Sequence, residues 1–303
     1  MFEKFFDFVR DKRMPYYLPN NLFNWYSRKK MMKDVTVRKI FVSITFDVEA
    51  ENIPNYHIKN FFEGIIKDLG NKKATFFICG NLISKFSYIL KKIQSKHEIG
   101  LHGFAHELWG DEKWWAIKKP IDYEQKGELL KLCLDIFKEN RLRRPISFRA
   151  PYLITNHDTF KLLKKNNFRV DSSLSSYLGN FSLPVKFFKG KIMSIPVSVN
   201  PLPKVSFQYL IPYTSYESFN WTFINNLDKN NFINFINSIF SWQIFNKIQP
   251  HLVFLAHSYQ VVENDKKLKY SHEKSEKMFK LFSFLEKNYQ VEYVTLRKLA
   301  ERL

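Results

Sequence analysis

Apolar runs of two kinds alternate along the first third of the chain. The β-branched run at 40–46 and the shorter runs at 74–78 and 97–101 are typical of buried strands. Apolar residues with helical spacing cover 57–69 and 82–94 between them. Because strands that alternate with helices usually pair in parallel through right-handed crossovers, the pattern predicts a parallel sheet.

The alternation continues to the C-terminus with one interruption. Residues 174–225 contain several prolines and many aromatic residues, so we expect hairpins and long loops there. About seven strand–helix units and no internal repeat predict one α/β domain, built as a closed or nearly closed barrel. The remaining helices are expected at 123–137, 158–165, 231–245 and 273–286, and the remaining strands near 146–149, 168–170, 252–255 and 291–294.

Polar side chains follow the first and third predicted strands. Asp47 and Glu49 end the first strand, and because strand side chains alternate, both point the same way while Val48 points into packing. His102 and His106 follow the third strand. Carboxyl ends of parallel strands share one rim, so the two pairs should converge there. Two histidines and one carboxylate would suit a catalytic metal ion and leave the other carboxylate as a base. Ordinary solvated side chains are the simpler alternative.

Further candidate residues lie near the same rim. Trp109, Trp114 and Trp115 could stack on sugar rings, although packing inside a loop is the more common fate of such aromatic residues. Arg149 ends a predicted strand and could hold a carboxylate through its planar guanidinium, or be a surface arginine. His257 is a polar residue at the end of another apolar strand.

The composition indicates the surroundings in which the protein works, but it says little about the reaction. Lys and Arg number 48 against 29 Asp and Glu, a formal charge of +19 that favours anionic surroundings such as phosphates, nucleic acid or a membrane surface. The basic residues are scattered and no nucleic-acid module is recognisable, so we expect no nucleic-acid partner. Two cysteines imply no disulfide framework, which favours a reducing compartment.

Residues 1–38 form an aromatic and basic extension before the predicted domain. Phe2, Phe5, Phe6 and Val9 have helical spacing, so a short helix could pack on the domain or lie on an anionic membrane surface. No apolar run is long enough to span a membrane, and no signal peptide is recognisable. We therefore expect a cytoplasmic protein with a peripheral contact at the inner membrane surface.

Five short motifs, taken together, resemble those of the polysaccharide deacetylase family, the NodB homology domain of carbohydrate esterase family 4. The resemblance implies a single catalytic domain over 39–303 with a distorted (β/α)7 barrel that removes acetyl groups from sugars. The motifs are, in family order, Thr45–Glu49, His102–His106, Phe148–Tyr152, Asp171–Ser173 and Leu255–His257.

The resemblance implies a role for each matching residue. Asp47 would be the general base, oriented by Arg149, and His257 would be the general acid, tuned by Asp171. In a branch of the family whose carboxylates are two residues apart, the second carboxylate joins the two histidines as the third metal ligand. The implied metal ligands are Glu49, His102 and His106, with one divalent ion, expected to be zinc.

Substrate contacts follow from the same resemblance and from the aromatic residues. Leu255 would line the acetyl pocket, the backbone N–H of Tyr152 would stabilise an oxyanion, and Trp109 is a candidate sugar platform. Two positions depart from the usual motifs, since Gly103 replaces a Ser or Thr and Ser258 replaces a frequent Asp.

The predicted function is a metal-dependent hydrolase that removes an N-acetyl or related acyl group from an amino sugar in a glycan or glycan precursor. One alternative is a deformylase or deacetylase of a lipid- or nucleotide-linked amino sugar. Another is a sugar-binding module without turnover on the same fold. The sugar, the acyl group and the oligomeric state stay open.

Overall fold

The computed structural model describes most of the chain. The residues described are 25–50, 54–112, 118–174, 182–202, 204–208, 211–221, 224, 228–263 and 266–303. The expected helix with Phe2, Phe5, Phe6 and Val9 lies outside these residues, as do Trp114 and Trp115. Within them, none of the helices has both the length and the apolar character that a membrane span requires.

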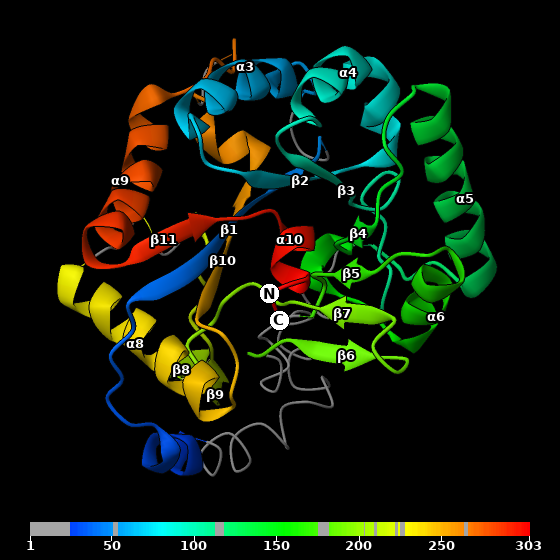
Figure 1. Cartoon of the computed structure of the whole chain (residues 1–303). Coiled ribbons are helices and arrows are strands. Elements are labelled where there is room, and N and C mark those ends of the chain that lie inside the picture. Colours follow the sequence, from blue (N-terminus) through cyan, green and yellow to red (C-terminus); the bar gives the residue numbers. More distant parts are fainter. Residues whose placement is uncertain are drawn as a thin grey trace.

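The described strands form one curled sheet of nine strands and a separate two-stranded hairpin (Figure 1). The larger sheet consists of β1 (Lys39–Val48), β2 (Ala74–Ile78), β3 (Glu98–Leu101), β4 (Ser147–Phe148), β5 (Val170–Asp171), β6 (Val185–Phe187), β7 (Ile192–Ser194), β10 (His251–His257) and β11 (Gln290–Tyr293). Seven strands in the order β10-β1-β2-β3-β4-β5-β7 pair in parallel with their neighbours, β11 also pairs in parallel with β1, and β6 is antiparallel to β7. The predicted α/β barrel class is therefore confirmed.

The two ends of the parallel series approach one another. Ser198, which follows β7, donates its backbone N–H to the carbonyl oxygen of Val253 in β10 at 3.0 Å. The N–H of Val253 donates in return to the Ser198 hydroxyl at 2.8 Å. These two hydrogen bonds join the segment that follows β7 to β10, so the sheet curls into a barrel-like ring.

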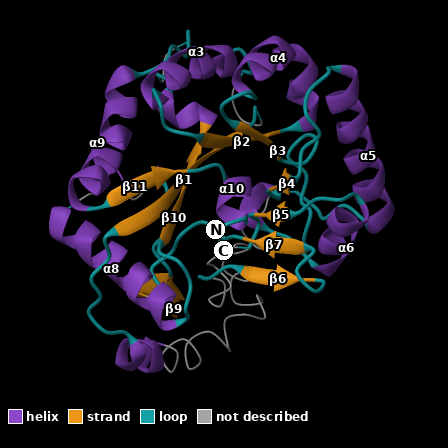
Figure 2. Ribbon diagram, in the orientation of Figure 1, coloured by secondary structure: helices purple, strands orange, loops and turns teal. Residues whose placement is uncertain are grey.

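Helices cover the outside of this ring (Figure 2). Along β1, Val42, Ile44 and Phe46 face an outer core between sheet and helices, whereas Phe41 belongs to a separate core inside the ring. The alternation follows from the two-residue period of strand side chains. The outer helices are α3 (His57–Leu69), α4 (Gly80–Ile93), α5 (Tyr123–Glu139), α6 (His157–Lys165), α8 (Lys229–Phe245) and α9 (His272–Asn288).

A short last helix, α10 (Leu296–Ala300), closes the amino end of the ring. Figure 1 shows it over the centre of the strands. Leu296 and Leu299 join the inner apolar core, and the N–H of Leu296 donates to the hydroxyl of Thr75 near the start of β2 at 2.8 Å. Apolar side chains of this helix therefore fill the centre of the ring at its amino end.

Most predicted elements are confirmed, and one region needs a correction. The predicted helix at 57–69 and strand at 74–78 have the bounds of α3 and β2. Residues 174–225 contain two hairpins, β6–β7 and β8 (Lys204–Gln208) with β9 (Ile211–Ser215). The expectation of hairpins and loops alone was incomplete, because β7 also pairs in parallel with β5 and supplies a strand of the barrel.

Candidate metal centre and catalytic groups

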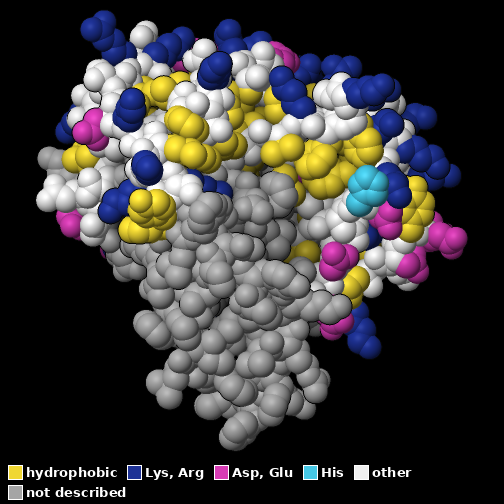
Figure 3. Space-filling view, turned by 90° about the horizontal axis from the view of Figure 1, so that it is seen from below, with side chains coloured by type: hydrophobic (Ala, Val, Ile, Leu, Met, Phe, Trp, Pro, Cys, Tyr) yellow, Lys and Arg dark blue, Asp and Glu magenta, His cyan; other side chains and the backbone are white. Residues whose placement is uncertain are grey.

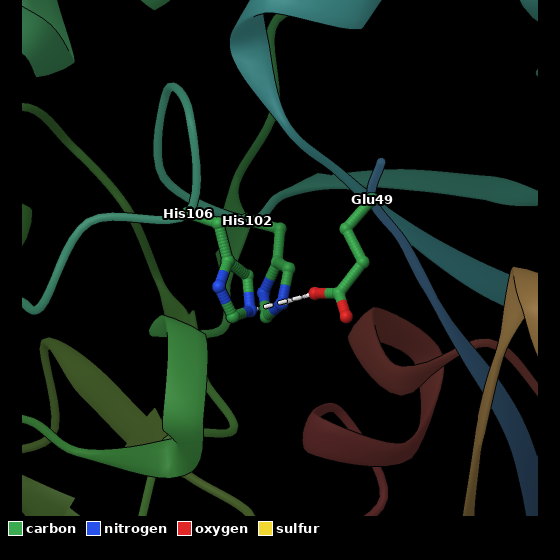
Figure 4. Close-up of side chains that lie close together, drawn as sticks. All are labelled: Glu49, His102 and His106. Carbon is green, nitrogen blue, oxygen red and sulfur yellow. Dashed lines mark ion pairs between the residues drawn. The ribbon is translucent and has the colours of Figure 1, made fainter. Parts of the chain in front are cut away.

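Three buried side chains converge at the carboxyl ends of β1 and β3. Glu49 directly follows β1 and His102 directly follows β3. His106 lies four residues after His102 in the same loop, and all three side chains are buried. The Glu49 Oε2 atom is 3.3 Å from Nε2 of His102 and 2.7 Å from Nε2 of His106. Figure 4 shows both rings turned toward the carboxylate. The convergence expected from parallel strand ends is therefore present.

A backbone hydrogen bond sets the orientation of His102. Its Nδ1 lies 2.8 Å from the carbonyl oxygen of Arg149, an atom that can only accept, so Nδ1 carries a proton. In the neutral ring the lone pair is then on Nε2, the nitrogen that faces Glu49. A hydrogen bond of this kind from the second ring nitrogen is the usual support of a metal-binding histidine.

The electrostatics of the cluster favour a cation. Burial acts to raise the pKa of Glu49, but the adjacent His102 and His106 rings lower it well below its usual range, so the carboxylate is ionised. Burial acts to lower the pKa of His102, yet the nearby charges of Asp47 and Glu49 raise it overall. Two carboxylates that draw a proton onto a buried imidazole would also stabilise a divalent ion, with which that proton would compete.

The donor set of Glu49, His102 and His106 fits a divalent ion. Their ligand atoms all lie within 4.8 Å of one another. Zinc binds such atoms at about 2.0–2.2 Å, so around one tetrahedral ion they would lie roughly 3.3 Å apart. The Oε2 atom of Glu49 is the atom that faces both imidazole nitrogens, so one ion could bind all three atoms at once.

The second carboxylate, Asp47, is held by Arg149 inside the ring of strands. Arg149 is fully buried and donates from Nη1 to Asp47 Oδ1 at 2.8 Å and to the Thr45 hydroxyl at 2.9 Å. Its Nη2 donates to the Ser172 hydroxyl at 2.9 Å, and its guanidinium lies 4.4 Å from the centre of the Phe77 ring. The other oxygen of Asp47 is 3.8 Å from His102 Nε2. Asp47 is thus beside the candidate metal ligands but bound to a different cation.

His257 and Asp47 are neighbours on two adjacent strands. β1 and β10 are parallel, and their register pairs Asp47 with His257. Paired residues of adjacent strands project to the same face, so both belong to the same rim. The structure therefore places the two residues side by side on adjacent strands.

Asp171 has contacts other than the expected one. Its oxygens accept hydrogen bonds from the Ser173 N–H and hydroxyl and from the Ser194 hydroxyl. Burial raises the pKa of Asp171, and these hydroxyl groups and Arg149 oppose the shift. Within the described residues, no hydrogen bond or ion pair joins Asp171 to His257, so the expected tuning has no direct contact behind it.

The predicted substrate contacts differ in exposure. Tyr152 is half-buried, has a left-handed φ of 59°, and places its ring 4.5 Å from that of His106. Leu255 is buried in β10 beside Thr45. Trp109 has no exposed surface and packs on Phe148, so the structure favours the packing alternative over a sugar platform for this residue.

Two residues that the sequence reasoning overlooked anchor the loop between the histidines. Glu107 accepts hydrogen bonds from the N–H groups of Phe104 and Ala105, at 3.0 and 2.5 Å, and from the Trp109 indole at 3.3 Å. Lys118 donates from Nζ to the carbonyl oxygens of Ala105 and His106, at 3.0 and 2.8 Å. These contacts hold His106 in its left-handed backbone conformation, with φ of 62°.

Gly103 leaves the space that this anchor occupies. Its φ is 68°, a conformation that side chains with a Cβ rarely adopt. A Cβ at this position would lie 2.8 Å from Trp109 Nε1 and 2.9 Å from Glu107 Oε2. The departure from the usual Ser or Thr therefore accompanies the Glu107 anchor. The sequence does show a glycine directly after His102 and a carboxylate directly after His106, and this combination could have indicated the anchor.

The chain is similar to several known proteins. Residues 34–170 match the family model described as polysaccharide deacetylase. The peptidoglycan deacetylase-like protein FGM2 of Gibberella zeae is 34% identical over 107 residues, which are 35% of this chain and 29% of that relative. The match thus spans less than a third of the curated relative's length.

Solved structures share the fold. A Mycobacterium smegmatis protein described as a candidate polysaccharide deacetylase superposes with a TM-score of 0.58 at 18% identity, over 88% of this chain and 92% of that chain. Puue allantoinase superposes with a TM-score of 0.59 at 12% identity, over 88% of this chain and 90% of that chain. At such identities the likeness concerns the fold, and the chemistry has to be argued from the site.

Glu107→Ala should weaken zinc binding by about 10–100-fold, the usual cost of losing a group that orients a metal ligand. Without the carboxylate, the N–H groups of Phe104 and Ala105 lose their acceptor, and His106 is no longer held toward Glu49. Zinc affinity can be measured by competition with a chelating dye. Glu124→Ala, which removes an exposed carboxylate from α5, is the control. Equal affinities of the two variants would show that the anchor is unimportant for the metal.

Proposed function

We propose that this chain, a member of the polysaccharide deacetylase family over residues 34–170, is a metal-dependent hydrolase acting on an amino sugar. The bond cleaved would be that of an N-acetyl or related acyl group in a glycan or glycan precursor. The observation that carries the proposal is that two buried carboxylates on one rim have different partners. Glu49 faces two imidazoles, and Asp47 faces a buried guanidinium.

The residues that would hold the metal are Glu49, His102 and His106. A divalent ion at this position, when bound, supplies Lewis acidity that lowers the pKa of a water molecule and polarises an amide carbonyl. Three protein ligands leave an open position, which is the arrangement of catalytic rather than structural zinc sites. The carbonyl oxygen of Arg149 holds the proton of the neutral His102 ring on Nδ1, so Nε2 would offer its lone pair to the metal.

Asp47 would act as the general base. The proton of the attacking water goes to one oxygen of Asp47, while the hydroxide oxygen forms the new bond to the acyl carbon. Arg149 holds the other oxygen at 2.8 Å, so the carboxylate is fixed in one orientation. Because Arg149 is fully buried, water does not compete for that contact.

His257 would act as the general acid. When the bond between the acyl carbon and the nitrogen breaks, the amine leaves with the electron pair and needs a proton, which an imidazolium can donate. The pairing of His257 with Asp47 in the strand register supports this role, since base and acid then lie on the same rim within reach of one substrate. The Tyr152 N–H would stabilise the oxyanion and Leu255 would line the acyl pocket, as the family resemblance implies.

The same groups would serve a formyl group or an amino sugar linked to a lipid or nucleotide. The positive charge of the chain supports an anionic neighbour such as a phosphate-linked sugar or a membrane surface. The expected cytoplasmic location and the peripheral membrane contact stay predictions. A sugar-binding module without turnover would not need a base and an acid held beside a candidate metal site, so we favour the hydrolase.

Asp47→Asn should lower the rate of acyl release by about 10²–10⁴-fold, because an amide cannot accept the water's proton. Acetate and formate released from small N-acylated amino sugars can be quantified for the zinc-loaded protein, which also tells the two acyl groups apart. Asp158→Asn, an exposed change on α6, is the matched control. A rate for Asp47→Asn equal to that of the control would contradict the assignment of the base.

His257→Ala should slow amide substrates far more than activated esters, since only the amine leaving group requires protonation. The comparison uses one variant with two substrates, so a smaller fraction of folded protein cannot imitate it, and the zinc content of the variant is measured alongside. His157→Ala, on the exposed side of α6, is the control for removal of an imidazole. Equal losses on both substrates would leave His257 as a positioning residue.

A further inference from the structure

A basic hollow lies at the amino ends of the strands, on the side of the barrel away from the candidate metal centre. It has a volume of about 580 Å³ and is walled by the segments that precede β2, β3 and β4 and by the start of α10. The metal ligands follow the carboxyl ends of β1 and β3, so the two sites are at opposite ends of the same sheet. The proposed hydrolysis uses none of the residues of this hollow.

Cationic side chains dominate its wall. Lys and Arg are common on the surface of this chain, as the upper rim of Figure 3 illustrates, so their presence alone is unremarkable in a protein with a formal charge of +19. What sets the hollow apart is that they gather around a concave space with few carboxylates. The wall contains six cationic side chains, which are Lys73, Lys96, Arg143, Arg144, Arg297 and Lys298.

The two carboxylates in the wall have partners already. Glu98 accepts hydrogen bonds from the Thr75 hydroxyl and the Arg297 N–H at 3.0 and 2.8 Å. Glu301 pairs with Lys298 at 2.7 Å and with Arg297 at 3.6 Å. Within the described residues, no carboxylate lies within ion-pair distance of the remaining four cations, so much of the positive charge is uncompensated.

Hydrogen bonds to the residues Gln94 and Asn166 hold two of the three arginines of the wall, Arg143 and Arg144, in place. Arg143 donates from Nη1 to the carbonyl oxygen of Gln94 at 3.0 Å, and its N–H donates to the side chain of the same residue at 2.9 Å. Arg144 donates from Nη2 to the carbonyl oxygen of Asn166 at 2.6 Å. Each guanidinium has five N–H donors, so most remain available after these bonds. Arginines fixed in this way lose less conformational freedom when an anion binds.

A neighbouring histidine is affected by the same environment. His97 is buried in the wall, and its Nδ1 accepts a hydrogen bond from the N–H of Ala74 at 3.3 Å. Burial and the charge of Lys96 lower the pKa of His97 to about 4, so the ring stays neutral at physiological pH. The positive charge of the hollow therefore comes from its lysines and arginines.

We propose that this hollow binds the phosphate group of an anionic ligand. Tetrahedral oxyanions accept the paired N–H groups of arginine, and a cluster of lysine and arginine neutralises their double charge. A hollow of this size suits a compact anion, whereas a nucleic-acid duplex requires a basic stripe along an extended surface. Two sources share the required chemistry, a soluble phosphate compound and the headgroup of an anionic phospholipid.

Calorimetric titration with inorganic phosphate and with tripolyphosphate tests the proposal on the full chain. We expect saturable binding at one site, tighter for tripolyphosphate and weaker as salt concentration rises, because salt screens exposed charges. The double variant Arg143→Gln/Arg144→Gln should lose at least about tenfold in affinity for tripolyphosphate. Lys131→Gln/Lys165→Gln removes the same charge from exposed positions of α5 and α6 and should leave the affinity within about twofold.

Sedimentation with vesicles of phosphatidylglycerol identifies the source. Vesicle binding that the arginine variant loses and tripolyphosphate displaces indicates a lipid headgroup. Phosphate binding without vesicle binding indicates a soluble compound, and both results support the hollow as a phosphate site. Absence of tripolyphosphate binding to the wild-type chain, or equal losses in the two double variants, would overturn the proposal. Circular dichroism and thermal unfolding of each variant verify that the fold is retained.

Discussion

A buried guanidinium is the constraint on which the rest of this site depends. Arg149 has no exposed surface, and an unpaired charge in such a place would be strongly destabilising. The charge is matched by Asp47, by the hydroxyls of Thr45 and Ser172, and by the face of the Phe77 ring. Removing one partner from a buried pair usually costs about 3–5 kcal/mol, so these groups have to stay together.

The partners of this guanidinium connect strands around the ring. The Thr45 hydroxyl donates to the carbonyl oxygen of Phe254 in β10, and the Ser172 hydroxyl donates to that of Ile195 after β7. Arg149 itself follows β4. The same network that neutralises the charge therefore fixes the carboxyl ends of β1, β4 and β10 relative to one another. The network also binds one oxygen of Asp47 to Arg149. Glu49 is then the carboxylate that contacts both histidines.

Much of this arrangement could be predicted from the sequence, because the polar residues directly follow apolar runs that are recognisable as strands. A buried run followed by Asp47 and Glu49, and another followed by His102, are enough to place these side chains on one rim of a parallel sheet. The family resemblance gave Arg149 and His257 their roles, and the contacts of both residues depend on strands far apart in the sequence. The pairing of Asp47 with His257 is a matter of register, which no local pattern determines.

Other parts could not be predicted for identifiable reasons. β7 has three residues, too few for a visible period, and it becomes a barrel strand only because β5 offers it an edge. Glu107 resembles any loop carboxylate until the fold of the loop brings three donors to it. Asp171 matched a motif, but its hydrogen bonds depend on Ser194 in β7, a strand that the sequence did not reveal.

The central claim is that the two carboxylates have separate duties, Glu49 toward the metal and Asp47 toward the water. The most direct test is the zinc-to-protein ratio, measured by mass spectrometry after dialysis, for the wild type, Glu49→Gln and Asp47→Asn. We predict one ion per chain in the wild type and in Asp47→Asn, and near-complete loss in Glu49→Gln, since Glu49 contacts both imidazoles whereas Asp47 lies near that of His102. Retention of zinc by Glu49→Gln together with its loss from Asp47→Asn would contradict the account.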